Sequence, residues 1–261
     1  PDLSYEEFLD FHRQYYHPSN SFIYLYGNMD MEEKLEFLDS HYLSAFDSLV
    51  IDSEIRDQEA FAQVKDIQKS YPVSEDEGEE DNTYLSYNMV VGEAADINLS
   101  LAFEVLDYAL LSAPGAPLKQ ALLDAKIGKD IYGSFEDGIK QTYFSIVAKG
   151  ANLSQKEEFV KVIRDTLTKI AEEGIDKKAV TAGINYYEFR FREADFSSYP
   201  KGLMYGLDIL SSWLYDDTKP FCEVQLLEGF EFLKKALEEG YFEDLIRKYL
   251  LDNTHGAILS L

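Results

Sequence analysis

The start of the chain shows first a helical and then an extended hydrophobic pattern. Ser4 and Glu7 have the spacing of a capping box, and apolar residues follow at helical intervals, which predicts a helix from about 4 to 16. Pro18 cannot continue that helix. Residues 21–26 are almost wholly apolar and rich in aromatics, so we expect a buried strand there.

The next segment contains a second helix, a connector and an acidic run. Asp30 is placed to cap a helix that ends near His41. Residues 52–63 have no apolar stripe and are predicted to be a connector, whereas 64–73 favours a strand. The acidic run 74–81 is predicted to be a solvated loop, because closely spaced like charges without an apolar anchor cannot be buried.

Residues 84–91 have the strict alternation of a strand. One set of alternating positions is Tyr84, Ser86, Asn88 and Val90, and the other is Leu85, Tyr87, Met89 and Val91. The acidic run would then lie between two strands, so we expect it to form the tip of a long hairpin rather than a domain linker.

The middle of the chain predicts a helix pair followed by a β-hairpin. Asp96 is placed to begin the first helix, and a second is expected over 116–125 after a Pro-Gly break. The segments 129–135 and 140–149 flank an Asp-Gly turn and predict an antiparallel hairpin.

The last third of the chain is mainly helical. Ser154 and Glu157 have the spacing of another capping box, ahead of an apolar helix face that ends at Gly174. Further helices are expected over 176–192, 201–213, 224–239 and 242–251, and a strand over 257–261. This order predicts the α+β class, with an antiparallel sheet and helices packed on one face.

The net charge restricts the partners that the chain can have. Its 261 residues include 49 acidic and 24 basic side chains, a formal charge of −25, so phosphate backbones are repelled and nucleic acid is excluded. Either the acidic surface is simply solvated, or it attracts basic peptides. No stretch approaches the ~18 apolar residues of a membrane span, so no membrane partner is expected.

A single cysteine, Cys222, excludes an internal disulfide and favours a reducing compartment, with the cytoplasm preferred. Its apolar neighbours predict a buried and inert thiol rather than a nucleophile.

The histidines show no metal-binding pattern. The four are His12, His17, His41 and His255, and none stands in a His-Glu-x-x-His motif or its inverse. His12 and His17 are about 140° apart around a helix, so they cannot share a metal on one helix face. We expect packing or capping roles for both.

Other candidate patterns are equally non-specific. With 49 carboxylates, acidic pairs such as Asp216-Asp217 and Glu79-Glu80 are interpreted as solvated. Clustered aromatics are interpreted as core packing, with the lining of a peptide groove as the alternative: Tyr15, Tyr16, Tyr186, Tyr187, Phe189, Phe191, Trp213 and Tyr215. The sequence therefore assigns no catalytic residue and no metal ligand, and it leaves the substrate-binding residues open.

Two segments resemble a known family. Residues 11–20, Phe-His-Arg-Gln-Tyr-Tyr-His-Pro-Ser-Asn, and the apolar run after them resemble the end of the first domain of insulinase/pitrilysin-type zinc metallopeptidases. The sequence of residues 24–28, Tyr-Leu-Tyr-Gly-Asn, resembles that of the presequence-protease branch. Residues 110–152, with Lys-Ile-Gly at 126–128, are similar to the second domain of that branch.

The resemblance implies that 1–60 is the C-terminal part of a first domain and 61–261 a second, non-zinc-binding α+β domain. Family members enclose a chamber in which a zinc-dependent endopeptidase degrades unfolded peptides. None of the family's zinc ligands or catalytic residues has a counterpart here. Zinc is thus implied for the parent enzyme and not for this chain, and the implied partners are the remaining domains and unfolded peptides, basic ones included.

A second hypothesis is a self-contained, non-catalytic peptide-binding or assembly module of the same fold. Such a module would bind a peptide or partner without cutting it. Under the first hypothesis the chain is an internal segment that forms chamber wall and scaffold, and is inactive alone. On either hypothesis the isolated chain is expected neither to retain zinc nor to cleave an unfolded basic peptide.

Overall fold

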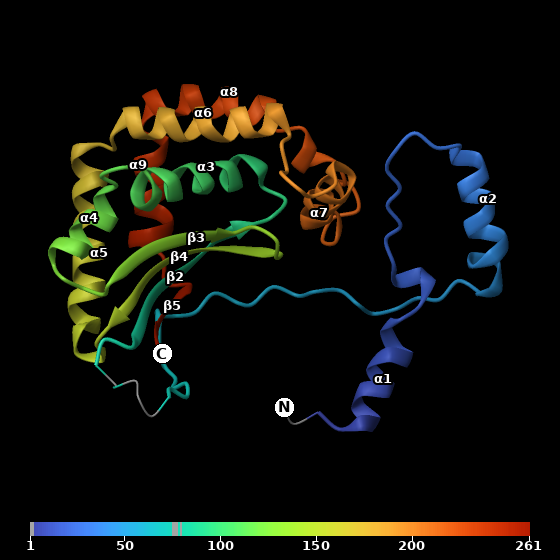
Figure 1. Ribbon diagram of the computed structural model, residues 1–261, viewed down its shortest axis with the longest axis horizontal. Coiled ribbons are helices and arrows are strands. Elements are labelled where there is room, and N and C mark those ends of the chain that lie inside the picture. The colour runs from blue at the N-terminus through green and yellow to red at the C-terminus, as the bar shows by residue number, and fades with distance from the viewer. Residues whose placement is uncertain (1–2, 75–77, 79) are drawn as a thin grey trace.

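Within the residues that the computed structural model describes, 3–74, 78 and 80–261, five strands form one sheet (Figure 1). They are β1 (Lys65–Gln68), β2 (Thr83–Glu93), β3 (Asp130–Glu136), β4 (Gln141–Ala151) and β5 (Gly256–Ser260). The strand order is β1-β5-β2-β4-β3, and every pairing is antiparallel except that of β1 with β5. The predicted hairpin is confirmed as β3 and β4.

Helices cover one face of this sheet, as Figure 1 shows. They are α3 (Ile97–Asp107), α4 (Pro117–Asp124), α5 (Lys156–Glu173), α6 (Lys177–Glu193), α8 (Leu227–Ala236) and α9 (Tyr241–Leu245), with π-helical turns η3 (Tyr108–Ser112) and η7 (Ile246–Leu251). Helices α3, α4 and α5 contact the sheet, and α6 and α8 pack on α3 from outside. The predicted α+β class with helices on one face is confirmed.

The alternation in β2 divides the sheet into a core face and a second face. Leu85, Tyr87 and Met89 are at most 1% exposed and point to the helices. The Tyr87 hydroxyl donates a hydrogen bond of 2.6 Å to the Leu250 carbonyl in η7, which satisfies the polar end of a buried ring. The polar set of β2, including Asn88, therefore lies on the face without helices.

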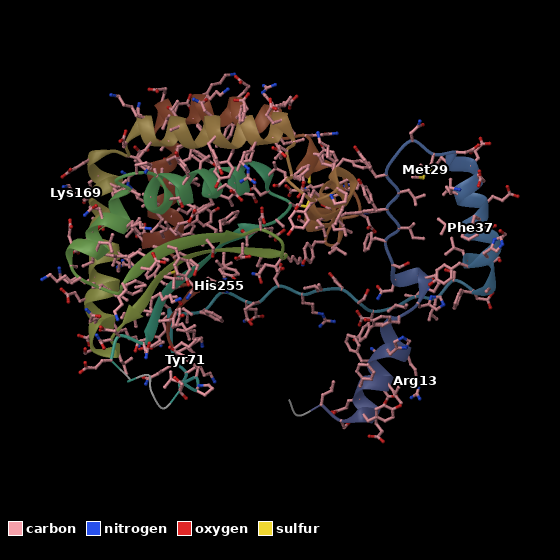
Figure 2. All side chains as sticks on the ribbon, in the orientation of Figure 1. Arg13, Met29, Phe37, Tyr71, Lys169 and His255 are labelled. Atoms are coloured by element: carbon pink, nitrogen blue, oxygen red, sulfur yellow. The ribbon has the colours of Figure 1, made fainter. Side chains whose placement is uncertain are left out.

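The first 60 residues form two helices apart from the sheet. Helix α1 (Tyr5–Tyr15) has the predicted Ser4 capping box, and α2 (Met31–His41) begins at the predicted cap Asp30. Neither helix buries a residue, and Figure 2 shows Phe37 of α2 far from the helices that cover the sheet.

The buried strand predicted over 21–26 is wrong. These residues are extended but belong to no sheet, and Phe22, Ile23 and Tyr26 are 39%, 41% and 53% exposed. A strand needs hydrogen-bonded neighbours, and the described residues provide none for this segment. It lies instead against α7 (Lys201–Trp213), where Gly206 lets the Tyr24 ring approach so closely that a Cβ would lie 2.8 Å away.

The predicted hairpin tip at 74–81 is also wrong. Strand β5 lies between β1 and β2, so the loop joins two strands that are not neighbours. The strand predicted over 64–73 is limited to β1, and residues 52–63 form no element, as predicted. Residues 75–77 and 79 of the acidic run lie outside the described residues.

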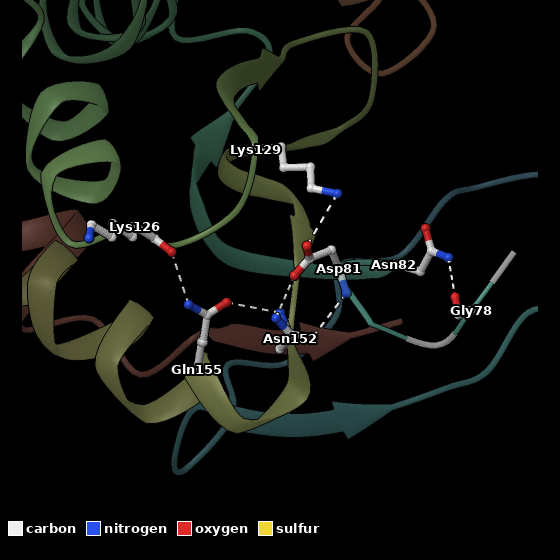
Figure 3. A network of polar contacts seen from close by, with 7 residues as sticks. All are labelled: Gly78, Asp81, Asn82, Lys126, Lys129, Asn152 and Gln155. Atoms are coloured by element: carbon white, nitrogen blue, oxygen red, sulfur yellow. Dashed lines mark hydrogen bonds and ion pairs between the residues drawn. The ribbon is translucent and has the colours of Figure 1, made fainter.

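The capping box predicted for Ser154 and Glu157 forms two residues earlier. Asn152 and Gln155 make it, at the short helix η4 (Leu153–Gln155) that leads into α5. Figure 3 shows why Asn152 is favoured: its amide also exchanges hydrogen bonds of 2.9 and 2.7 Å with Asp81, at the entry to β2. Gln155 extends the network to the Lys126 carbonyl at 3.0 Å, so the cap ties three segments together.

The remaining helices follow the predictions with shifted ends. The helix predicted over 224–239 begins later, as α8, and finishes in η6 (Leu237–Glu239), after a separate turn η5 (Cys222–Val224). The segment 242–251 divides into α9 and η7. The short turns η1 (Pro18–Asn20) and η2 (Leu43–Ala45) complete the N-terminal part.

Candidate functional site

The four histidines lie on separate elements and serve local roles. His17 caps η1, accepting a hydrogen bond of 3.1 Å from the Ser19 amide at Nδ1, and His12 stacks on Tyr16 at 4.5 Å between ring centroids. His41 stacks on Phe37. In the described part of the chain no three His, Cys, Asp or Glu side chains are grouped to hold a metal, so these residues do not fit a zinc site.

The other sequence candidates are placed as follows. Cys222 is half-buried rather than buried, with its Sγ 3.1 Å from the Ser212 hydroxyl. Among the clustered aromatics, Tyr16 and Phe189 are 69% and 64% exposed, so they are not core residues. Tyr187, by contrast, packs against the core and lines a cavity. Glu79 lies outside the described residues.

The face of the sheet opposite the helices carries a row of small side chains. Ser134, Ser145, Asn88 and Ala257 are successive cross-strand partners on β3, β4, β2 and β5, and therefore point to the same side. Asn88 joins them, because its amide nitrogen donates to the Ser86 hydroxyl at 2.8 Å and to the Ala257 carbonyl at 3.1 Å, while its oxygen accepts from Ser145. We call this surface the open sheet face.

A groove of about 460 Å³ lies where the open sheet face meets the connector. Its lining includes Phe61, Asn88, Tyr143, Tyr215 and His255. The His255 ring packs edge-on against Phe61 at 4.8 Å, and Figure 2 places His255 beside the sheet. The groove is largely apolar, with an amide and an imidazole among its polar groups.

Specific hydrogen bonds hold the connector along this groove. Gln141 at the start of β4 makes a pair of bonds to the Gln58 backbone, 2.7 Å from its amide and 3.1 Å to its carbonyl. Lys140 donates to the Ile55 carbonyl at 2.9 Å and pairs with Asp57 at 3.0 Å. The groove wall is thus positioned by the β3–β4 hairpin rather than left free.

A second hollow lies among the helices and is lined by five carboxylates. This carboxylate cavity, of about 280 Å³, is lined by Glu104 of α3, Asp208 of α7, Glu223 of η5, Asp137 and Asp195. Burial raises the pKa of Glu104 to about 7, against the lowering effect of a hydrogen bond with Tyr187. Burial also raises the pKa of Glu223 to about 8, and the nearby carboxylates Asp137, Asp208 and Glu104 add to the rise.

No helix within the described residues has the length and apolar character needed to cross a membrane. In the described residues, neither hollow groups three side chains that could hold a metal ion.

Comparison with known proteins finds a matching family model and several similar proteins. The family model described as "Peptidase M16 inactive domain" matches residues 2–187. The chain is 47% identical to Protein HypA of Clostridium perfringens and 36% identical to presequence protease 1, chloroplastic/mitochondrial, of Arabidopsis thaliana. Both matches cover 100% of this chain but only 27% and 25% of the relatives.

A solved structure of a protease from Helicobacter pylori superposes with a TM-score of 0.71 at 15% identity, covering 100% of this chain and 59% of that one. At that identity the likeness concerns the fold alone. The match of the family model over most of the chain is the stronger finding. The chain belongs to the Peptidase M16 inactive-domain family, and within it resembles the presequence proteases.

Proposed function

We propose that this chain is a non-catalytic segment of a zinc-dependent endopeptidase that degrades unfolded peptides in a closed chamber. The chain spans about a quarter of the length of the relatives it matches, so the zinc site and the catalytic base would lie in the rest of the parent protein. Its own contribution would be chamber wall and scaffold.

The open sheet face carries this proposal. A sheet normally buries both faces or exposes one polar face, and this one presents small polar side chains where no helix of the described residues covers it (Figure 1). Ser134 and Asn88 are partly exposed and would offer polar groups to an extended peptide. Partly exposed apolar groups such as Tyr132 and Ile67, 41% and 38% exposed, would contact the peptide side chains.

The N-terminal part supports a second element of the proposal, a domain boundary near residue 60. Helices α1 and α2 are amphipathic, yet their apolar residues are exposed, for example Phe8 at 56% and Leu35 at 55%. Apolar patches of this kind mark interaction surfaces. We assign 1–60 to a preceding domain of the parent protein, which would cover these faces, and 61–261 to the second domain.

The test uses the full-length parent protein and this chain side by side. The parent should hold about one zinc per chain and cleave an unfolded peptide, whereas this chain should do neither. In the parent, Ser134→Arg on the open sheet face should lower kcat/KM for the peptide about tenfold. The matched control Thr168→Arg, at an exposed position on α5, should leave kcat/KM unchanged.

Two outcomes would contradict the proposal. Equal activity of the Ser134→Arg parent and the control would show that the open sheet face does not line the chamber. The self-contained binding module would be favoured instead if this chain binds the peptide while every longer form of the protein lacks zinc and cleavage activity.

A further inference from the structure

An apolar groove of about 740 Å³ lies between the extended segment 24–26 and the helices α6, α7 and α8. Its lining includes Tyr24, Tyr26, Ile209, Phe221 and Leu227. It is separate from the open sheet face, because it belongs to the helical side of the molecule. Phe221 and Leu227 are 55% and 41% exposed, so the groove has an accessible apolar rim.

The outer wall of the apolar groove is fixed by close packing on α7. A Cβ at Gly202 would lie 2.4 Å from the Tyr26 ring, and one at Gly206 would lie 2.8 Å from the Tyr24 ring. Tyr26 also packs on Tyr205, with 5.9 Å between ring centroids. The two tyrosines therefore hold a defined position rather than hanging from a free segment.

The apolar groove and the carboxylate cavity are adjacent. Phe191 of α6, Tyr205 of α7 and Val224 of η5 line both hollows. A ligand could therefore place an apolar group in the groove and a polar group in the cavity at the same time. This combination of an apolar surface with a few convergent polar groups is typical of ligand sites.

The charge of the cavity indicates what the polar group would be. Five carboxylates line it, but the one cationic side chain in its lining is Arg190. Among the residues that the structure describes, no lysine or arginine nitrogen forms an ion pair with any of these five carboxylates. Arg190 lies over the Tyr186 ring, 5.6 Å from its centroid, and its charge opposes the effect of burial on the pKa of Glu104. One arginine among five carboxylates leaves an excess of negative charge, which favours a cation from outside.

An organic cation fits this site better than a metal ion. The described carboxylates are not grouped in threes at ligand distances, as a metal would require. Aromatic rings line the same space, namely Tyr187, Phe191 and Tyr205. Aromatic faces stabilise guanidinium and ammonium groups, and Arg in particular stacks on them.

We propose that the apolar groove and the carboxylate cavity together bind a peptide segment in which an apolar side chain is followed by Arg or Lys. The apolar side chain would lie against Tyr24, Ile209 and Phe221, and the cationic group would lie between Glu104, Asp208 and Glu223. This inference rests on the proposed function for its peptide substrate and deepens it, since it names the peptide class and a second contact surface outside the open sheet face.

The experiment measures the binding of two fluorescein-labelled peptides to the full chain by fluorescence anisotropy at pH 8. One peptide carries Leu-Arg-Leu-Arg in a Gly-Ser background, and the other carries Leu-Gln-Leu-Gln. The test variant is the triple substitution Glu104→Gln, Asp208→Asn and Glu223→Gln. The matched control, Glu158→Gln, Glu172→Gln and Glu239→Gln, replaces the same number of carboxyl groups at exposed positions.

We expect the cavity variant to bind the Arg peptide at least about tenfold more weakly than the wild type, and the control to change by less than about twofold. Phe221→Ser should weaken the binding of both peptides, because it removes an exposed apolar group at the rim. Urea unfolding checks the fold, and removal of buried charges should not lower the stability of the cavity variant.

Equal losses of affinity for the Arg peptide in the cavity variant and the control would show that only the overall charge attracts the peptide. This result would overturn the proposed site. Absence of binding to the wild type up to about 1 mM peptide would overturn it as well. Neither result depends on cleavage or on zinc. A failure of this binding site can therefore be distinguished from a failure of the proposed peptidase function.

Discussion

The stability of this domain should fall as the pH rises through the neutral range, because of Glu104 and Glu223. Their pKa values in the folded chain are raised to about 7 and about 8, from an ordinary value of 4.5. Between pH 4.5 and 8 the folded chain thus keeps protons that the unfolded chain releases, so deprotonation favours unfolding. The stabilising contribution is complete below about pH 4.5 and is lost above the folded pKa values.

The magnitude follows from the size of these pKa changes. A rise from 4.5 to about 7 at Glu104 corresponds to an upper limit of about 3 kcal/mol. Both side chains are only half-buried, so solvent screening reduces the effect, and the rise at Glu223 is caused partly by Glu104. We expect the pair to lower the free energy of unfolding by about 2–4 kcal/mol between pH 5 and pH 9.

Urea unfolding at pH 5, 7 and 9 measures this, with the fluorescence of Trp213, the single tryptophan, as the signal. The double variant Glu104→Gln and Glu223→Gln removes both titrations, so its stability should fall less with rising pH than that of the wild type. Some decrease should remain, because burial also raises the pKa values of Asp107, Asp137 and Asp208. Glu172→Gln, at an exposed position on α5, is the matched control and should follow the wild type. A wild-type stability that falls no more than that of the double variant would refute the reasoning.

Two further predictions concern packing. Gly206→Ala should lower the free energy of unfolding by about 1–3 kcal/mol and shift Trp213 emission, because the new Cβ would meet the Tyr24 ring, although Ala normally stabilises a helix by about 1 kcal/mol. An unchanged or raised free energy of unfolding would show that the segment 24–26 moves away from α7 at little cost. Phe103→Ala, at a fully buried ring, should cost about 3–5 kcal/mol in urea unfolding, and Phe189→Ala, at an exposed ring, less than about 0.5.

The sequence predicted the sheet and its helices because their signals are local. The alternation over 84–91 placed Met89 and Asn88 on opposite faces of a strand, and the caps Ser4, Asp30 and Asp96 marked three helix starts. The sequence prediction failed where contacts with residues distant in the sequence determine the structure. The run 21–26 has the composition of a buried strand, yet the described residues provide no neighbouring strand.

The two candidate sites show the same limit. Asn88 was visible as a polar position of a strand, but its neighbours Ser134 and Ser145 are brought to it by cross-strand pairing that no pattern specifies. One signal for the carboxylate cavity was available in the sequence. Glu104 is the one charged residue between Ile97 and Leu106. A single charge in an apolar helix indicates either strain or a site.

The position of Glu104 is informative because the residues on either side of it in α3 obey the ordinary rules of packing. Its neighbours Phe103 and Val105 are fully buried, and an apolar residue at 104 would avoid the cost of a partly buried carboxylate. Glu223 adds a second such cost beside it. Residues that break the ordinary packing rules are expected at functional sites, and here two occur together, in a cavity beside an accessible apolar groove. A surface carboxylate would suffice for solvation, so the placement of these two among aromatic rings favours the binding of a cation over a purely structural role.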